Sequence, residues 1–281
     1  MGLFLIFYIM ISCTTIEKII DPINQETVLI NKKISYDGIS VELVIEKPIK
    51  NEVDVLMVFH GTVKYDSLVL QAAQNTLIRF KEILDRKDIM IVSVAYPEEN
   101  MLFGDNIRQC EAALLWIKNK THQELGVKVK KVFLGGHSQG GYLVTRLNTM
   151  HVTDGVIANA PGPLNLVFRC QLEEDGKIAN EIVCNTLSKT YGTTNSNPVA
   201  YQERSLLHFT KAFKSDILFV QGLDDSPIQM YSWPLFKQQV VDCKDCKVVT
   251  FLEVPSFGHS ALFGSIQAKE TFNDFIKKRS L

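Results

Sequence analysis

The feature that most constrains this 281-residue sequence is a series of solid apolar runs separated by segments of helical periodicity. None of these runs shows the polar alternation of a strand with one face in water, so we expect strands that are covered on both faces. The runs are residues 53–61, 88–97, 131–136, 154–161, 216–222 and 247–255.

An antiparallel hairpin is expected ahead of these runs. Two alternating segments within residues 28–48 flank Asp37-Gly38, a dipeptide typical of tight hairpin turns. A final helix is expected over about 265–278. A hairpin followed by alternating strands and helices predicts one α/β domain, residues 28–281, with a mostly parallel, doubly wound sheet.

The stretch from about 163 to 212 interrupts the alternation and is predicted to form a small helical cap over the strand ends. In an oxidising compartment, Cys170 and Cys184 would staple a loop within it, and Cys243 and Cys246 would close a tight turn. The single CxxC lacks the second ligand pair of a zinc site.

The sequence Gly136-His137-Ser138-Gln139-Gly140 follows one buried run and precedes a helical segment. It matches the G-x-S-x-G pattern, in which glycines permit a sharp strand-to-helix turn that exposes a serine hydroxyl. Serine is a weak nucleophile unless a base lies within hydrogen-bond reach and a third group orients that base. Ser138 is therefore the candidate nucleophile.

An acid and a base follow at later strand ends, in the order that this pattern requires. Asp225 is the expected acid, and its neighbour Asp224 remains an alternative, because both follow the run 216–222. His259 comes after the last run and is the expected base, since its two nitrogens can face Ser138 and an aspartate together. His137 is expected to pack beside the nucleophile.

Two backbone amides are needed to receive the negative oxygen of a reaction intermediate. The amide of Gln139 is one candidate, and the loop His60-Gly61-Thr62 supplies the other, with Thr62 preferred over Gly61. No nucleotide-binding or metal motif is present in the sequence, so no cofactor and no metal are expected.

The first 13 residues are almost wholly apolar, but the run is too short for a membrane-spanning helix. They are interpreted as an export leader, followed by a polar linker over 14–27. The end of the leader resembles a bacterial lipobox, which predicts lipidation of Cys13 and a place in the cell envelope. A plain cleaved signal, with a secreted or periplasmic product, is the alternative.

From about residue 28 onward the sequence resembles the α/β-hydrolases, and most of all the catalytic domain of prolyl-oligopeptidase-like proteins. The carrying features are GHSQGGYLV, NPVAYQERSLLHF (197–209) ahead of DILFVQGLDD, and FGHS. This resemblance implies a triad of Ser138, Asp225 and His259 and an acyl-serine intermediate. The form GHSQGG is common among esterases, so ester hydrolysis and peptide cleavage both stay open.

Three hypotheses follow: a serine hydrolase that cleaves an ester or amide, a small peptidase, and a non-catalytic envelope binding protein on the same fold. A small ester or short peptide is the expected substrate. The formal net charge of −1, with no long block of one sign, indicates no nucleic-acid partner. The oligomeric state is left open by the sequence.

Overall fold

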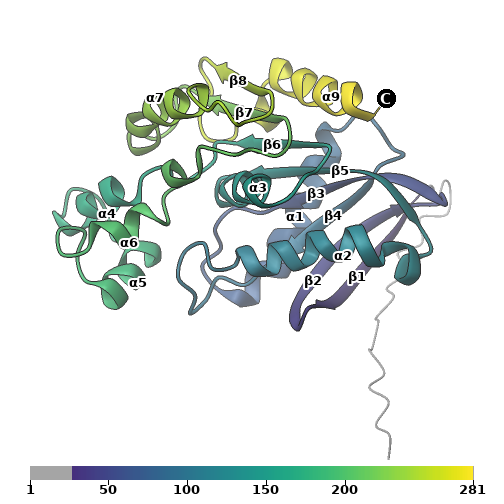
Figure 1. Ribbon diagram of the computed structural model, residues 1–281, viewed down its shortest axis with the longest axis horizontal. Coiled ribbons are helices and arrows are strands. Elements are labelled where there is room, and N and C mark those ends of the chain that lie inside the picture. Colours follow the sequence, from purple (N-terminus) through teal and green to yellow (C-terminus); the bar gives the residue numbers. More distant parts are fainter. Residues whose placement is uncertain (1–26, 281) are drawn as a thin grey trace, which may run out of the picture.

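An eight-stranded sheet runs through the computed structural model, which describes residues 27–280 (Figure 1). Its spatial order is β1-β2-β4-β3-β5-β6-β7-β8. The strands are β1 Thr27–Tyr36, β2 Ile39–Pro48, β3 Glu52–Phe59, β4 Met90–Ala95, β5 Lys128–His137, β6 Gly155–Asn159, β7 Ile217–Gly222 and β8 Val249–Val254. The predicted leader, most of the linker and Cys13 lie outside the described residues.

Strands β1 and β2 form the predicted hairpin. Asp37 and Gly38 both have positive φ (49° and 77°), as a two-residue hairpin turn requires. The pairs β1–β2 and β2–β4 are antiparallel, whereas the pairs from β4 through β3 to β8 are parallel. The predicted fold class, a mostly parallel α/β sheet with an antiparallel start, is confirmed.

Helices cover both faces of this sheet, which explains why its strands β3, β4, β6 and β7 are buried almost throughout. In β3, Val55, Met57 and Phe59 join one core layer, while Leu56 and Val58 join the other. Side chains of α2, α3 and α7 belong to the first layer, and those of α1, α8 and α9 to the second. These helices are α1 Val69–Ile83, α2 Ile107–Leu125, α3 Gln139–Met150, α7 Pro227–Val241, α8 Ala261–Gly264 and α9 Ile266–Ser280.

The predicted cap, residues 163–212, is helical. It lies beyond the carboxyl ends of the strands, to the left in Figure 1. Its elements are α4 Leu166–Glu174, α5 Ile182–Tyr191, α6 Pro198–Gln202 and the short 3-10 helix η2 Leu206–Phe209. A disulfide joins Cys170 in α4 to Cys184 in α5, and a second joins Cys243 to Cys246 between α7 and β8. Within residues 27–280, no helix is both long and apolar enough to cross a membrane.

The turn from β5 into α3 is so tightly packed that two of its positions admit glycine alone. A Cβ atom at Gly136 would lie 2.1 Å from the carbonyl oxygen of Gly140, and one at Gly140 would lie 2.0 Å from that of Phe59. The obstacles are backbone atoms, which cannot swing aside as a side chain can. Glycine at these positions lets α3 begin directly against the end of β3.

Gly140→Ala is expected to lower the free energy of unfolding by about 3 kcal/mol, because the backbone of α3 or β3 must shift to admit the methyl group. Gly126→Ala is the control, since Gly126 has positive φ (67°) but open space around it. Gly126→Ala should lower the free energy of unfolding by about 1 kcal/mol, which is the cost of placing alanine at positive φ without a steric clash. Urea unfolding followed by circular dichroism measures both, and equal losses would contradict the packing argument.

Candidate active site

Ser138 occupies the turn between β5 and α3 with an unusual backbone conformation. Its φ is 57° and its ψ is −119°, which few non-glycine residues adopt. The surrounding main chain holds this conformation: Ser138 N donates to Asn159 O (3.0 Å), and Ser138 O accepts from Tyr142 N (3.0 Å) and Gly162 N (3.2 Å). These hydrogen bonds fix the backbone of Ser138, which lines a pocket.

His259, from the loop after β8, lines the same pocket as Ser138. Its Nδ1 lies 2.8 Å from Asp225 Oδ2. A hydrogen bond there places the Nδ1 proton toward the carboxylate and leaves Nε2 free to accept one. Among the described residues no hydrogen bond links the Ser138 hydroxyl to Nε2; in substrate-free enzymes such bonds are often long.

The two adjacent aspartates differ in what they contact. The Asp225 side chain is only 4% exposed and accepts further hydrogen bonds from Gln221 Nε2 (2.9 Å) and Ser226 N (2.6 Å). Burial alone would raise the pKa of Asp225, but the hydrogen bonds from His259 and Gln221 hold it below its usual value. Asp224 is exposed, and Asp225 is the one that contacts His259.

The loop after β3 lies close to Ser138. A Cβ atom on Gly61 would lie 3.4 Å from Ser138 Cβ, and Thr62 lines the pocket. Within residues 27–280, the backbone N–H groups of Thr62 and Gln139 donate to no other protein group. Both remain free to receive an oxyanion, as their positions in the sequence suggest.

His60 holds this loop in shape. Its Nδ1 lies 2.7 Å from Gly61 O, its ring stacks on Tyr96 with centroids 3.9 Å apart, and the Tyr96 hydroxyl donates to His60 O. Burial lowers the pKa of His60 to about 4. His60 is therefore uncharged at neutral pH.

His137 lies beside the candidate nucleophile, with its ring centroid 4.9 Å from that of His259. Burial, with contributions from His259 and Arg79, lowers the pKa of His137 to about 3. Its Nδ1 lies 2.7 Å from Asn159 Nδ2, and Asn159 also donates to His259 O (3.2 Å) and accepts from Leu262 N (3.1 Å). Asn159 thus connects the turn at Ser138 to the loop that carries His259.

Sequence reasoning did not identify Asn159 or Gln221, which are hydrogen-bonded to His137 and to Asp225. Asn159 and Gln221 are fully buried polar residues near the carboxyl ends of β6 and β7. A polar side chain inside an otherwise apolar strand was the available signal, since buried polar groups need partners. Within residues 27–280, no group of three or more metal-ligating side chains is arranged around one point.

The pocket at Ser138 has a volume of about 400 Å³, and the cap forms part of its wall. Leu164, Asn165 and Arg169 contribute from the cap side, and Ile228 contributes from α7. Arg169 is ion-paired with Glu173 (3.4 Å) and with Glu181. The cap therefore forms part of the wall of the pocket that Ser138 lines.

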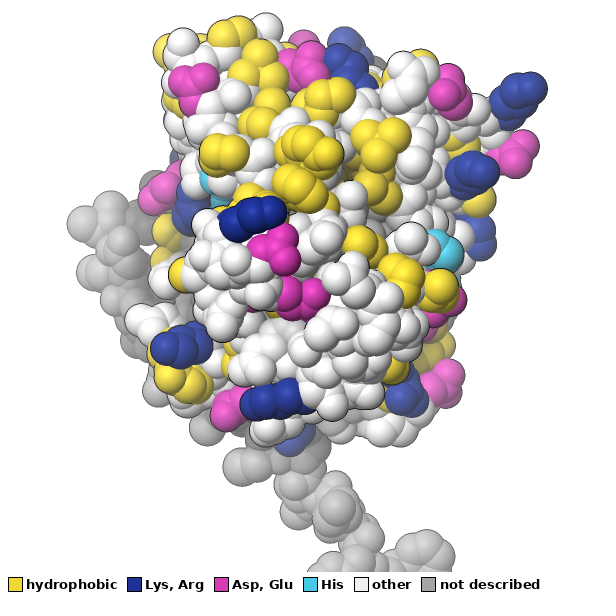
Figure 2. All heavy atoms as spheres, turned by 90° about the vertical axis from the view of Figure 1, so that its left-hand side faces the viewer, with side chains coloured by type: hydrophobic (Ala, Val, Ile, Leu, Met, Phe, Trp, Pro, Cys, Tyr) yellow, Lys and Arg dark blue, Asp and Glu magenta, His cyan; other side chains and the backbone are white. Residues whose placement is uncertain are grey.

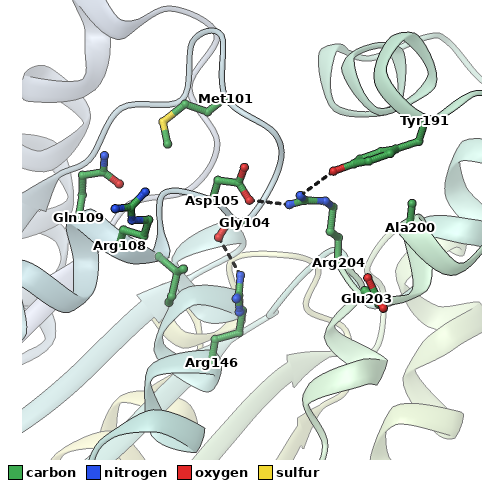
Figure 3. Close-up of a pocket in the computed structure, with 11 residues that line it drawn as sticks. Met101, Gly104, Asp105, Arg108, Gln109, Arg146, Tyr191, Ala200, Glu203 and Arg204 are labelled. Atoms are coloured by element: carbon green, nitrogen blue, oxygen red, sulfur yellow. Dashed lines mark hydrogen bonds and ion pairs between the residues drawn. The ribbon is translucent and has the colours of Figure 1, made fainter.

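A larger cavity of about 620 Å³ separates another part of the cap from the loop before α2 (Figure 3). Arg204 crosses this junction: its Nη1 donates to Phe103 O (2.8 Å) and Asp105 Oδ1 (2.7 Å), and its Nη2 donates to the Tyr191 hydroxyl (3.2 Å). Arg146 donates to Gly104 O (2.7 Å) from the floor of the same cavity. Arg204 fastens the cap to the rest of the domain.

Arg204→Met is expected to lower the free energy of unfolding by about 2 kcal/mol, because it removes hydrogen bonds from a charged donor that is 19% exposed. The control is Lys177→Met. It breaks an exposed ion pair with Asp175 within the cap, which contributes less than about 1 kcal/mol. Urea unfolding measures both variants; equal effects would show that Arg204 does not anchor the cap.

A family model described as the α/β hydrolase fold matches residues 57–194. Among solved structures, Est1E from Butyrivibrio proteoclasticus superposes with a TM-score of 0.63 at 15% identity, covering 89% of this chain and 98% of that one. A fungal esterase from Rhizomucor miehei gives a TM-score of 0.65 at 14% identity, covering 91% and 83%.

An acylaminoacyl peptidase from Pyrococcus horikoshii gives a TM-score of 0.63 at 14% identity. It is matched over 91% of this chain but only 42% of its own length. A search of curated proteins found no match. The sheet order, the strand–turn–helix at Ser138 and these matches agree: the chain has the α/β-hydrolase fold.

Proposed function

We propose that this protein is a serine hydrolase that cleaves a carboxylic ester through a covalent acyl-serine intermediate. The observation that carries the proposal is the pairing of Asp225 with His259 in the pocket that also exposes Ser138. Nothing in the packing requires a strained serine, a buried carboxylate and a half-exposed histidine at one point. Their combination is the arrangement that activates a hydroxyl nucleophile.

In the proposed reaction, His259 Nε2 takes the proton of the Ser138 hydroxyl as Ser138 Oγ bonds to the carbonyl carbon of the substrate. The carbonyl oxygen becomes negative and is received by the amides of Gln139 and Thr62. His259 then passes its proton to the leaving alkoxide, and the acyl group stays on Ser138. His259 then takes a proton from water as the water oxygen bonds to the acyl carbon, and it passes that proton to Ser138 Oγ as the acyl–serine bond breaks, which releases the acid. Asp225 holds the imidazole and stabilises its charged form throughout.

An ester substrate with an apolar portion is favoured by the surface beside the pocket. Tyr231 and Leu235 of α7 are 67% and 50% exposed, and Phe168 of the cap stacks on Tyr231 with centroids 4.0 Å apart. Figure 2 shows apolar side chains gathered on the side of the molecule that carries α7 and the cap. Exposed apolar clusters of this kind commonly border ligand sites.

Peptide cleavage is the second candidate, and the likeness to the acylaminoacyl peptidase fold is the observation that favours it. Both reactions would use the same triad, so the fold does not separate them. Parallel assays with p-nitrophenyl acyl esters and aminoacyl-p-nitroanilides separate ester hydrolysis from peptide cleavage. We expect turnover of the esters, and turnover of the anilides alone would favour the peptidase.

A fluorophosphonate probe is expected to label the wild-type protein covalently, because the probe reacts with activated serine hydroxyls. Ser138→Ala removes the nucleophile and is expected to abolish labelling and ester hydrolysis while the fold is retained. Gel fluorescence and circular dichroism measure the two properties. Folded wild-type protein that takes up no label and hydrolyses no ester would instead favour a non-catalytic binding protein.

Asp225→Asn is expected to lower kcat about 10⁴-fold, because an amide cannot hold the imidazole of His259 in the required tautomer. Asp224→Asn is the matched control, and it should leave kcat within about twofold, since an exposed surface carboxylate contributes little. Steady-state hydrolysis of a p-nitrophenyl ester measures both. The reverse pattern would reassign the acid to Asp224.

A further inference from the structure

A largely buried carboxyl group, that of Glu98, lies directly behind the candidate oxyanion donors. Glu98 follows β4, and its side chain is only 10% exposed. Its Oε2 accepts from Val63 N (3.2 Å), next to Thr62. In the amide orientation that gives both its oxygen and its nitrogen hydrogen-bond partners, the side-chain nitrogen of Gln139 lies 3.1 and 3.2 Å from the two oxygens of Glu98. One carboxyl group thus contacts both segments that carry the donors.

The Gln139 amide extends this network. With its nitrogen toward Glu98, it also donates to Thr62 Oγ1 (2.7 Å), while its oxygen accepts from Asn106 Nδ2 (3.0 Å). Gln139 is therefore bonded to Thr62 and Glu98 at once. The two donors, which come from different segments of the chain, are connected by side chains as well as by backbone packing.

Glu98 is itself anchored independently of these donors. Its backbone N–H and that of Glu99 both donate to Asp66 Oδ1 (2.8 Å each). The loop after β4 is therefore tied to the 3-10 helix η1, Asp66–Leu68, and can serve as a fixed support.

We propose that Glu98 is a positioning residue that holds the amides of Thr62 and Gln139 in the geometry that receives the oxyanion. This inference rests on the proposed function. The carboxyl group acts through Val63 N and the Gln139 side chain and does not touch the substrate. Misplacement of such donors is costly, because loss of one oxyanion donor lowers kcat by about 10²- to 10³-fold.

The charge of Glu98 bears on the same step. Burial raises the pKa of Glu98 to about 8; the Val63 N–H opposes this, and the charge of Asp66 adds to it. Glu98 is therefore uncharged at neutral pH and ionises as the pH passes about 8. An ionised carboxylate behind the donors would repel the developing oxyanion, so the reaction should slow above that pH.

The other ionisable groups around Glu98 do not replace it in this role. His60, at the end of β3, lies 3.9 Å away and has a pKa lowered to about 4 by burial, so it is uncharged. Burial raises the pKa of Cys110 in α2 and that of Tyr96 in the loop after β4, so both groups are uncharged. Arg146 of α3 is bound to Gly104 O and the Tyr142 hydroxyl. Lys64 is exposed and borders the same small cavity of about 40 Å³ as Glu98.

Glu98→Gln tests the proposal, because glutamine resembles the protonated carboxyl in shape and cannot ionise. For p-nitrophenyl ester hydrolysis, wild-type kcat/KM is expected to fall above pH 8, whereas the variant should keep its neutral-pH activity and lose that fall. Glu98→Ala should lower kcat by about 10-fold or more with KM within about twofold. Glu99→Gln, an exposed neighbouring carboxylate, is the matched control and should reproduce the wild-type profile.

Thermal unfolding gives a readout that does not depend on activity. Because the folded-state pKa of Glu98 lies above its ordinary value, its protonated form contributes stability that is full below about pH 4.5 and is lost as the pH rises to about 8. The difference between the Tm of Glu98→Gln and the Tm of the wild type should therefore increase in favour of the variant as the pH rises from 5 to 8.

A Glu98→Gln variant that keeps the alkaline fall, or a folded Glu98→Ala variant with wild-type kcat, would overturn the proposal. If Glu98→Ala does not fold, the pH profile of Glu98→Gln still decides. Fluorophosphonate labelling of the wild type distinguishes failure of the positioning role from failure of the hydrolase proposal. Labelling at Ser138 without any effect at Glu98 refutes the positioning role alone, while absent labelling refutes the hydrolase proposal.

Discussion

The backbone contact between the start of α3 and the end of β3 is the constraint on which the site depends. At Gly140 the backbones of α3 and β3 are so close that a single methyl group would lie 2.0 Å from the carbonyl oxygen of Phe59. This contact brings Gln139 beside the loop that carries Thr62, and it supports the strained backbone of Ser138 between them. The candidate nucleophile and both candidate oxyanion donors therefore depend on one packing arrangement, which the cores on the two faces of the sheet hold in place.

Burial sets the charge state of the groups around the site. His137 adjoins Ser138 and His60 belongs to the loop that carries Thr62, yet burial lowers the pKa of His60 to about 4 and that of His137 to about 3, so both are uncharged at neutral pH. Each is bound to a neighbour, His60 to Gly61 O and His137 to Asn159. His259 differs because it is 43% exposed and faces the carboxylate of Asp225. Of these three histidines, His259 is the one hydrogen-bonded to a carboxylate, which would stabilise a charged imidazole in the proposed reaction.

The cap joins the domain through the hydrophobic core as well as through polar contacts. Arg204 bonds to Phe103 O and Asp105, and the disulfide between Cys170 and Cys184 ties α4 to α5 within the cap. The pocket wall formed by the cap contains Arg169 with its two glutamate partners. In the proposed reaction, these cap residues and the exposed apolar side chains of α7 would set substrate choice, whereas the candidate triad lies on the loops of the sheet.

The sequence by itself determined the sheet, the hairpin, the cap and the turn at Ser138. Apolar periodicity and glycine placement are local signals that reflect burial and backbone shape over a few residues. Tertiary structure decided which aspartate contacts His259, because the sequence favoured Asp225 but left Asp224 open, and the two differ in what surrounds them. It also revealed Asn159, Gln221 and Glu98, whose partners lie in other elements of the chain. Hydrogen bonds between distant segments leave no period in a sequence, since they depend on where folding brings each side chain.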